Sequence, residues 1–307
     1  MTLTELRYIV AVAREKHFGR AAEACFVSQP TLSVAIKKLE DELDVKLFER
    51  GSSEVSVTPL GEEIVRQAQA TLEQAAAIKE IAKRGKDPLA GPLRLGIIYT
   101  IGPYLLPELV KNAIERVPQM PLMLHENFTV KLLEQLRTGE LDCAIMAEPF
   151  PDTGLAIAPL YDEPFVVAVP RTHPLARRDS ISAQELKQET MLLLGTGHCF
   201  RDHVLEVCPE FARFASDAEG IRKSFEGSSL ETIKHMVASG MGITVVPQLS
   251  VPADPQAHLA YVPFTEPVPT RRVVLAWRRT FTRYEAIAAL RNAIYACTLP
   301  GVTRLTA

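Results

Sequence analysis

The sequence predicts three consecutive parts: a small winged helix-turn-helix domain of the α+β class, one long linker helix, and a two-lobed α/β domain. Three observations support this. The chain begins with short apolar-periodic stretches that suit short helices, continues as a long polar helix without a breaker, and then alternates strands with amphipathic helices from Gly91 onward. The expected domains are residues 1–58, 59–90 and 91–307, with lobe I formed by 91–162 plus 268–307 and lobe II by 163–267.

Length and composition narrow the class of protein. The chain has 307 residues, 47% of them hydrophobic and 23% charged, so it is long enough for more than one core. This composition excludes collagen, disulfide-scaffold and disordered classes. No stretch approaches 18 apolar residues, and the N-terminus lacks the features of a secretory signal. We therefore expect a cytoplasmic protein without membrane association, whose 5 cysteines are mostly free thiols.

The N-terminal segment has the pattern of a helix-turn-helix. Residues 18–25 suit a short helix, residues 26–28 suit a turn, and Ser28 can cap a second helix with Pro30 near its start. In that second helix the apolar side chains fall on one face at helical spacing. They are Leu32, Ala35, Ile36, Leu39 and Leu43. A helix of this kind enters the DNA major groove with its N-terminal residues.

The opposite face of the second helix offers contacts to DNA. Its small polar side chains can bond to bases or phosphates, its valine suits a thymine methyl, and its lysine suits a phosphate. A short β wing would follow and carry one arginine to the DNA backbone. The candidate contacts are Ser28, Gln29, Pro30, Thr31, Ser33, Val34, Lys37 and Arg50. The alternative is a plain three-helix packing domain, and charge does not decide, because residues 1–50 hold eight basic and eight acidic side chains.

The long helix has a clear start and a seam of small residues. Thr58 is a good N-cap and Pro59 suits the first helical position. The seam follows a heptad-like spacing, which favours pairing with a second copy of the chain. It consists of Ile64, Ala68, Thr71, Ala75, Ile78 and Ala82. The alternative is a helix packed on its own domain.

Beyond residue 91, strands and helices alternate, which predicts a mostly parallel, open sheet in each lobe. Ligands in such sheets bind beyond the carboxyl ends of the strands. Thr100 and Thr129 each lie at such a strand-to-helix junction, although threonine there is often only a helix cap.

A resemblance agrees with all three parts. The run FGRAAEACFVSQPTLSVAIKKLEDELDVKLFERGSSEVSVTPLGE is similar to the N-terminal domain of LysR-type transcriptional regulators. Membership of that family implies a winged helix-turn-helix, a linker helix that dimerises, and a two-lobed effector domain like a periplasmic binding protein. It therefore implies DNA binding.

Two cysteines lie near a predicted helix in the effector domain. Cys199 follows a Gly-rich turn, with His198 beside it and Arg201 one turn away, and this setting favours a thiolate. A thiolate that attacks peroxide becomes a sulfenic acid, which condenses with a second thiol. Cys208 is the candidate for that thiol. If residues 199–208 are helical, the thiols lie about 13.5 Å apart along the axis, so a disulfide would require local unwinding. Without further information, two unrelated buried thiols are the more common explanation.

Several segments resemble the hydrogen-peroxide-sensing branch of the LysR-type family. They are YTIGPYLLP, ENFT, LYDEPF, GHCFRD and SSLETIKHMVASGMGI. This resemblance implies that Cys199 is the peroxidatic cysteine and Cys208 the resolving one. It also implies a peroxide pocket, to which we assign Thr100, Thr129, His198, Arg271 and Asp202, the last as a residue that orients His198 or Arg201 or caps the helix.

The resemblance further implies an activator of peroxide-defence genes that works as a homotetramer, a dimer of dimers. Its partners would be double-stranded promoter DNA, hydrogen peroxide and RNA polymerase. We expect no cofactor, no metal and no enzymatic function. Three alternatives stay open at this point: a LysR-type regulator of a metabolite bound between the lobes, a thiol peroxidase with a DNA-binding domain, and a transport binding protein. The remaining cysteines, Cys25, Cys143 and Cys297, are expected to be structural.

Overall fold

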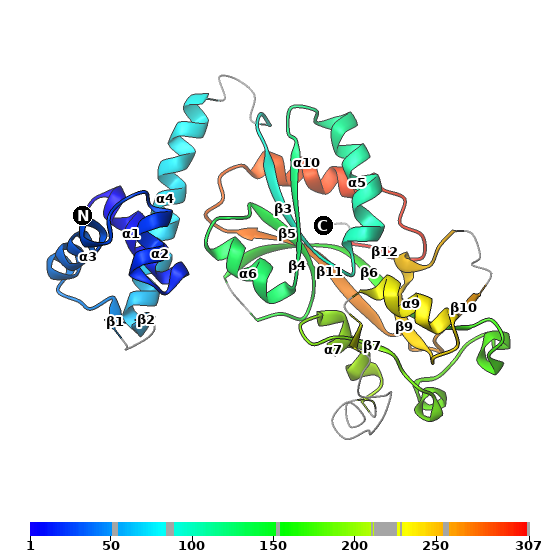
Figure 1. Cartoon of the computed structure of the whole chain (residues 1–307). Coiled ribbons are helices and arrows are strands. Elements are labelled where there is room, and N and C mark those ends of the chain that lie inside the picture. Colours follow the sequence, from blue (N-terminus) through cyan, green and yellow to red (C-terminus); the bar gives the residue numbers. More distant parts are fainter. Residues whose placement is uncertain are drawn as a thin grey trace.

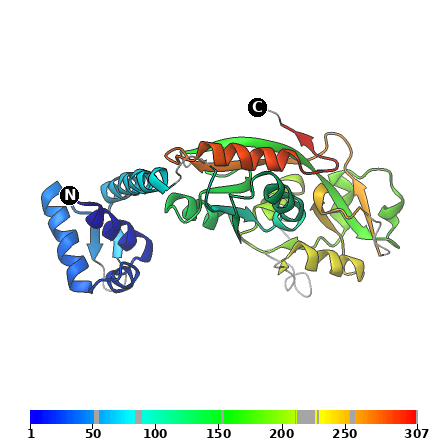
Figure 2. The ribbon, with the colours of Figure 1, turned by 90° about the horizontal axis from the view of Figure 1, so that it is seen from above.

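The computed structural model describes residues 1–50, 55–83, 89–151, 154–209, 211, 226–227, 229–253 and 258–305. In two perpendicular views the N-terminal domain lies at one end of the molecule, the long helix α4 lies next to it, and the two effector lobes follow (Figures 1 and 2). The N-terminal domain, lobe I and lobe II each have their own hydrophobic cluster. Within the described ranges, no helix is long and apolar enough to cross a membrane.

The N-terminal domain is a winged helix-turn-helix, as predicted. Its elements are α1 (Leu3–Glu15), α2 (Phe18–Ala24), α3 (Gln29–Leu43), β1 (Phe48–Arg50) and β2 (Val55–Val57). Ser28 is the N-cap of α3 and accepts the backbone N–H of Thr31, so the capping prediction is confirmed. Leu32, Ile36 and Leu39 are buried in the domain core. The strands β1 and β2 pair antiparallel and form the wing.

Helix α4 (Pro59–Lys83) begins where the sequence indicated. Thr58 Oγ1 accepts the N–H of Gly61, which is the capping bond expected ahead of Pro59. The first turns pack on the N-terminal domain, where Ala68 is buried and Ile64 lies against the same cluster. Ile78, farther along the predicted seam, is 69% exposed. The first half of the helix therefore packs on its own domain, whereas Ile78 in the second half stays exposed, and pairing with a second copy remains a prediction.

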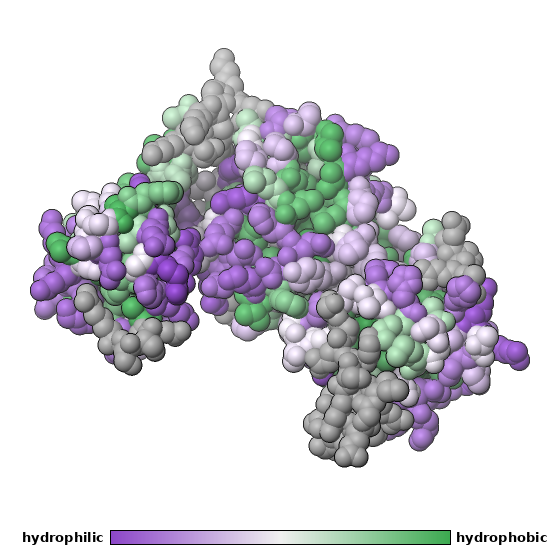
Figure 3. Space-filling model, viewed as in Figure 1, coloured by the Kyte–Doolittle hydropathy of each residue, from purple (hydrophilic) through white to green (hydrophobic). Residues whose placement is uncertain are grey.

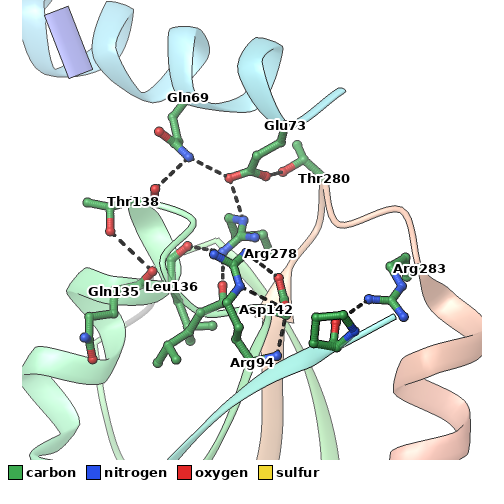
Figure 4. A network of polar contacts seen from close by, with 12 residues as sticks. Gln69, Glu73, Arg94, Gln135, Leu136, Thr138, Asp142, Arg278, Thr280 and Arg283 are labelled. Atoms are coloured by element: carbon green, nitrogen blue, oxygen red, sulfur yellow. Dashed lines mark hydrogen bonds and ion pairs between the residues drawn. The ribbon is translucent and has the colours of Figure 1, made fainter. Parts of the chain in front are cut away.

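Polar contacts also hold α4 against lobe I (Figure 4). Gln69 Nε2 donates to the carbonyl oxygen of Thr138 at 2.8 Å. Glu73 forms an ion pair with Arg278, at 2.7 Å between Oε1 and Nε, and its other carboxylate oxygen accepts from the Thr280 hydroxyl. Both charged side chains of this pair are nearly buried. The ion pair therefore connects the linker helix directly to the effector sheet.

Each effector lobe combines a sheet with covering helices. Lobe I holds β3 (Leu93–Ile98), α5 (Gly102–Arg116), β4 (Leu122–Asn127), α6 (Thr129–Arg137), β5 (Cys143–Ala147), α10 (Tyr284–Tyr295) and β12 (Thr303–Arg304). Lobe II holds η1 (Pro174–Arg177), η2 (Ala183–Gln188), β7 (Leu193–Leu194), α7 (Cys199–Val207), β8 (Glu226–Gly227), α9 (Leu230–Ala238), β9 (Thr244–Pro247), η4 (Gln248–Ser250) and β10 (Leu259–Pro263).

The expectation of a mostly parallel sheet is wrong. Only β3 with β4 and β5, and the small pair β7 and β8, are parallel among the described strands. A strand of 16 residues, β6 (Leu155–Pro170), runs through both lobes and pairs antiparallel with β9, β10, β12 and β11 (Thr270–Arg278). The long strand β6 accounts for the difference. It passes from one lobe to the other without a helix, and the strands that pair with it run in the opposite direction.

Candidate functional site

The two cysteines of interest lie at opposite ends of one helix. Cys199 is the first residue of α7 and is half-buried, whereas Cys208 is its C-cap and is fully buried. Nine residue steps along a helix span about 13.5 Å and place the side chains on opposite faces. A disulfide requires Cα atoms within about 7 Å, so in this fold the two thiols are reduced and out of reach of each other.

A sharp turn at Gly197 and aromatic contacts of His198 position the start of α7. Gly197 has φ +100°, a conformation that favours glycine, and any Cβ there would lie against the Phe128 ring. His198 is buried, and its ring lies edge-on to Tyr99 and Phe128, with centroids 5.8 and 4.8 Å away. These contacts join the start of α7 in lobe II to two strand ends of lobe I.

Cys199 lines a very small cavity between the lobes. Its volume is about 10 Å³, close to the space that one water molecule needs. Thr100, Thr129, Gly197 and His198 line it together with Cys199. Thr129 is buried, and its hydroxyl has no hydrogen-bond partner within the described part of the chain. A buried hydroxyl without a partner is costly, so this one is suited to a small polar ligand.

Neither threonine is a helix cap. The N-cap of α5 is Ile101 and that of α6 is Phe128, so the capping alternative does not explain Thr100 or Thr129. The hydroxyl of Thr100 accepts a hydrogen bond from Arg271 Nη1 at 2.8 Å. A guanidinium only donates, so the Thr100 O–H proton is left to donate to another group.

The structure places the remaining predicted pocket residues outside the cavity wall. Arg271 is 2% exposed and lies behind Thr100, which it contacts through both the hydroxyl and the carbonyl oxygen. Asp202 lies in the first turn of α7 with its side chain exposed, and it does not line the cavity. An acidic side chain at this position stabilises the helix through the helix dipole and remains in contact with solvent. Arg201 donates to the carbonyl oxygen of Leu194.

A second cavity of about 190 Å³ adjoins the first and shares Tyr99, Thr100 and His198 with it. Across it the Tyr104 hydroxyl donates to Glu231 Oε1 at 2.6 Å, a bond that connects α5 of lobe I to α9 of lobe II. Burial and this bond raise the pKa of Tyr104 above its usual value. Burial opposes ionisation of Glu231 as well, but the bonds from Tyr104 and from Lys234 outweigh it, and the pKa of Glu231 is lowered.

Sequence reasoning missed His203, which anchors α7. Its Nε2 lies 2.8 Å from the carbonyl oxygen of Glu148, just after β5 of lobe I. Because a carbonyl only accepts, Nε2 carries the proton of this bond. Burial lowers the pKa of His203, which favours the neutral ring. The helical spacing from Phe200 was the one available signal, and it indicates only that His203 faces the core.

The other three cysteines have the properties of structural thiols. Burial raises the pKa of Cys143 and of Cys297. It also raises the pKa of Cys25, although Arg14 and Arg7 oppose the change. A raised pKa leaves less thiolate and a weaker nucleophile.

The predicted DNA-contact face of α3 is open to solvent. Ser28, Gln29, Pro30, Thr31 and Lys37 are exposed and Val34 is 69% exposed, while Ser33 is half-buried. The face opposite the buried one is therefore accessible to a partner. The side chain of Arg50 lies outside the described residues, although its backbone belongs to β1.

Known families match both halves of the chain. Residues 3–62 match the bacterial regulatory helix-turn-helix protein of the lysR family, and residues 86–296 match the LysR substrate binding domain. The chain belongs to the LysR family. LysR-family proteins are DNA-binding regulators and not enzymes, so the thiol peroxidase alternative is not supported.

Relatives of this LysR-family chain extend over nearly its whole length. A hydrogen peroxide-inducible genes activator of Pectobacterium carotovorum subsp. carotovorum is 41% identical and covers 94% of this chain and 95% of its own. A full-length OxyR C199D structure from Pseudomonas aeruginosa is 52% identical, covers 97% and 99%, and superposes with a TM-score of 0.75. An H2O2-bound OxyR variant from Corynebacterium glutamicum is 35% identical, covers 95% and 91%, and has a TM-score of 0.63.

Replacing Thr129 with valine tests the unpartnered hydroxyl of this LysR-family site. We expect the rate of Cys199 oxidation by hydrogen peroxide to fall about two- to tenfold, the worth of one neutral hydrogen bond. Thermal stability should stay equal or rise, because the lost hydroxyl has no partner among the described residues. Quenched-flow alkylation measures the rate. Thr138→Val, at the other end of α6, is the matched control, and equal rates in both variants would contradict the prediction.

Proposed function

We propose that this chain is a transcription regulator that senses hydrogen peroxide through Cys199 and Cys208. The Cys199 thiolate attacks one peroxide oxygen; an S–O bond forms, the O–O bond breaks, and hydroxide leaves. The resulting sulfenic acid condenses with the Cys208 thiol, which releases water and forms the disulfide. Two equivalents of a cellular thiol reduce the bond and are oxidised to a disulfide themselves. The chain would work in the cytoplasm, where its promoter DNA lies.

One observation carries the proposal: Cys199 faces a cavity of about 10 Å³ lined by two buried threonines, and a second thiol ends the same helix. A cavity this small excludes a metabolite and leaves room only for a very small polar molecule. Two relatives that are 41% and 40% identical over nearly the whole chain are named hydrogen peroxide-inducible genes activators, which supports the same signal. The adjoining cavity of about 190 Å³ could hold a small metabolite, but the names of the relatives given above point to peroxide.

The disulfide would refold α7, and the signal has a route to the DNA-binding domain. Strand β11 carries Arg271, which contacts Thr100 behind the cavity, and Arg278, which contacts the linker helix, so the two contacts lie on one element. A shift of lobe II against lobe I would therefore bear on the Glu73–Arg278 ion pair. At DNA, the exposed N-terminal half of α3 would read the major groove, with Lys37 and Arg50 on phosphates.

The active species would be a homo-oligomer, a dimer of dimers that recruits RNA polymerase. Two surfaces support self-association. The first is the second half of the α4 seam, where Ile78 is exposed. The second lies on lobe I, where hydrophobic side chains gather over β4 and α5 (Figure 3) and Ile114, Met123 and Leu124 are exposed. In the described sheet β4 pairs on one side only, with β3, so its other edge is open.

Peptide mass spectrometry before and after low peroxide tests the mechanism. Trypsin cuts after Arg201, so Cys199 and Cys208 fall in separate peptides, 188–201 and 202–213. We expect a linked pair after peroxide and its loss on thiol treatment, with Cys143 and Cys297 still alkylated. Cys199 found only as sulfenic or over-oxidised forms, without the link, would contradict the disulfide switch.

A further inference from the structure

A fully buried carboxylate lies behind the cavity, on the strand that joins the two lobes. Glu163 in β6 is 0% exposed and lies directly opposite Arg271 of β11. Its Oε2 accepts from Arg271 Nε at 2.9 Å and lies 2.8 Å from Nη2. Its Oε1 accepts the backbone N–H of Leu249 in lobe II at 2.8 Å. Both oxygens are therefore engaged, one with each lobe.

The other edge of the same guanidinium holds Thr100. Arg271 Nη1 donates to the Thr100 hydroxyl at 2.8 Å and Nη2 donates to the Thr100 carbonyl oxygen at 2.9 Å. The Phe200 ring covers the guanidinium, with its centroid 5.1 Å from Cζ. The guanidinium of Arg271 therefore bonds to Glu163 on one edge and to Thr100 on the other, and Phe200 covers one face. It cannot rotate without breaking bonds to Glu163 or to Thr100.

This arrangement determines what Thr100 can do. Because the guanidinium only donates, the Thr100 oxygen is the acceptor and its proton is available to another group. Thr100 lines the cavity beside Cys199. We propose that Glu163 is a positioning residue of the peroxide reaction: by fixing Arg271, it keeps Thr100 as a hydrogen-bond donor toward the peroxide.

The Thr100 hydroxyl acts when the O–O bond of the peroxide breaks. When the Cys199 thiolate attacks the near oxygen, the O–O electron pair passes to the far oxygen, which leaves as hydroxide. A hydroxyl that is already aimed at that oxygen stabilises the developing charge without reorganisation. The inference rests on the proposed peroxide chemistry. It adds a residue that touches neither the sulfur nor the cavity and acts through Arg271 and Thr100.

The test compares Glu163→Gln with Asp162→Asn in the full chain. Asp162 is the next residue on the same strand and pairs with Arg272, but that pair faces solvent, so it is a matched control. We expect Glu163→Gln to slow oxidation of Cys199 by hydrogen peroxide about fivefold, no more than the loss of one neutral hydrogen bond at the cavity. Alkylation of Cys199 by iodoacetamide should change less than twofold. Asp162→Asn should leave both rates unchanged.

The two probes separate positioning from folding. Equal losses of oxidation and alkylation would mean that Glu163 only supports the fold, and an unchanged oxidation rate would equally overturn the proposal. A wild-type chain that peroxide does not oxidise at Cys199 would overturn the proposed function, and this inference with it. In that case the wild-type measurement alone would identify the failure.

Removing a buried counter-ion can prevent folding, so a second set of variants covers that case. Replacing both members of the pair with apolar residues, Glu163→Leu with Arg271→Met, leaves no uncompensated charge. This double variant should oxidise at Cys199 at least about fivefold more slowly than the wild type, while alkylation changes less than twofold. An oxidation rate equal to that of the wild type would overturn the proposal.

Discussion

Replacing Cys199 with serine should abolish the peroxide response of the full chain. Serine keeps the size of the side chain and its place at the start of α7, but its hydroxyl cannot be oxidised as a thiolate can. DNA footprints of the variant before and after peroxide should be identical. The footprint without peroxide should match that of the reduced wild type, because the helix-turn-helix is unaltered.

Cys25→Ser is the matched control for this experiment. Cys25 is half-buried at the end of α2 in the DNA-binding domain, and burial raises the pKa of its thiol. Its substitution should leave the peroxide-dependent change in the footprint intact. A footprint that still shifts with peroxide in Cys199→Ser would reject Cys199 as the sensor, and a shift lost only in Cys25→Ser would relocate the sensor to the DNA-binding domain.

Sequence patterns predicted the N-terminal domain well because its determinants are local. The cap at Ser28 and the spacing of Leu32, Ile36 and Leu39 determine α3 without reference to the rest of the chain. The continuity of the long strand β6 through both lobes was missed because its middle reads as a turn, with Asp162 and Glu163 directly before Pro164. Its strand character comes from pairing with β11, more than 100 residues later, and no local signal reports such a pairing.

The candidate site shows the same division. Strand order alone could place Thr100 and Thr129 at strand ends where ligand sites form, but the family resemblance was needed to assign them and Cys199 to one pocket. The residues that support them, Glu163 and His203, could not be predicted in this way. Glu163 becomes conspicuous only once β6 is known to be a strand, since a charge inside a buried strand must be paired. His203 depends on a contact with a carbonyl of the other lobe.

The free energy that packs α7 should set the potential of the switch. Val204 lies midway between the two cysteines and is buried in the lobe II cluster of this reduced form, so we expect unwinding of α7 to expose it. Val204→Ala removes two methyl groups, worth about 0.8 kcal/mol each, or about 1.6 kcal/mol of stabilisation in the reduced form. The reduced form is destabilised relative to the disulfide, so the midpoint potential should fall. At about 30 mV for 1.4 kcal/mol, the expected shift is about 35 mV.

Redox titration in mixtures of reduced and oxidised dithiothreitol measures this shift, with alkylation reporting the free thiols. Val169→Ala is the control: Val169 is fully buried in the same cluster but lies on β6, which needs no unwinding to bring the cysteines together. That substitution destabilises both redox forms equally and should leave the potential in place. Equal shifts in the two variants would mean that α7 stays packed when the disulfide forms. A lower potential in Val204→Ala alone would show that unpacking α7 is the energetic cost of sensing, and that this cost keeps the disulfide reducible by cellular thiols.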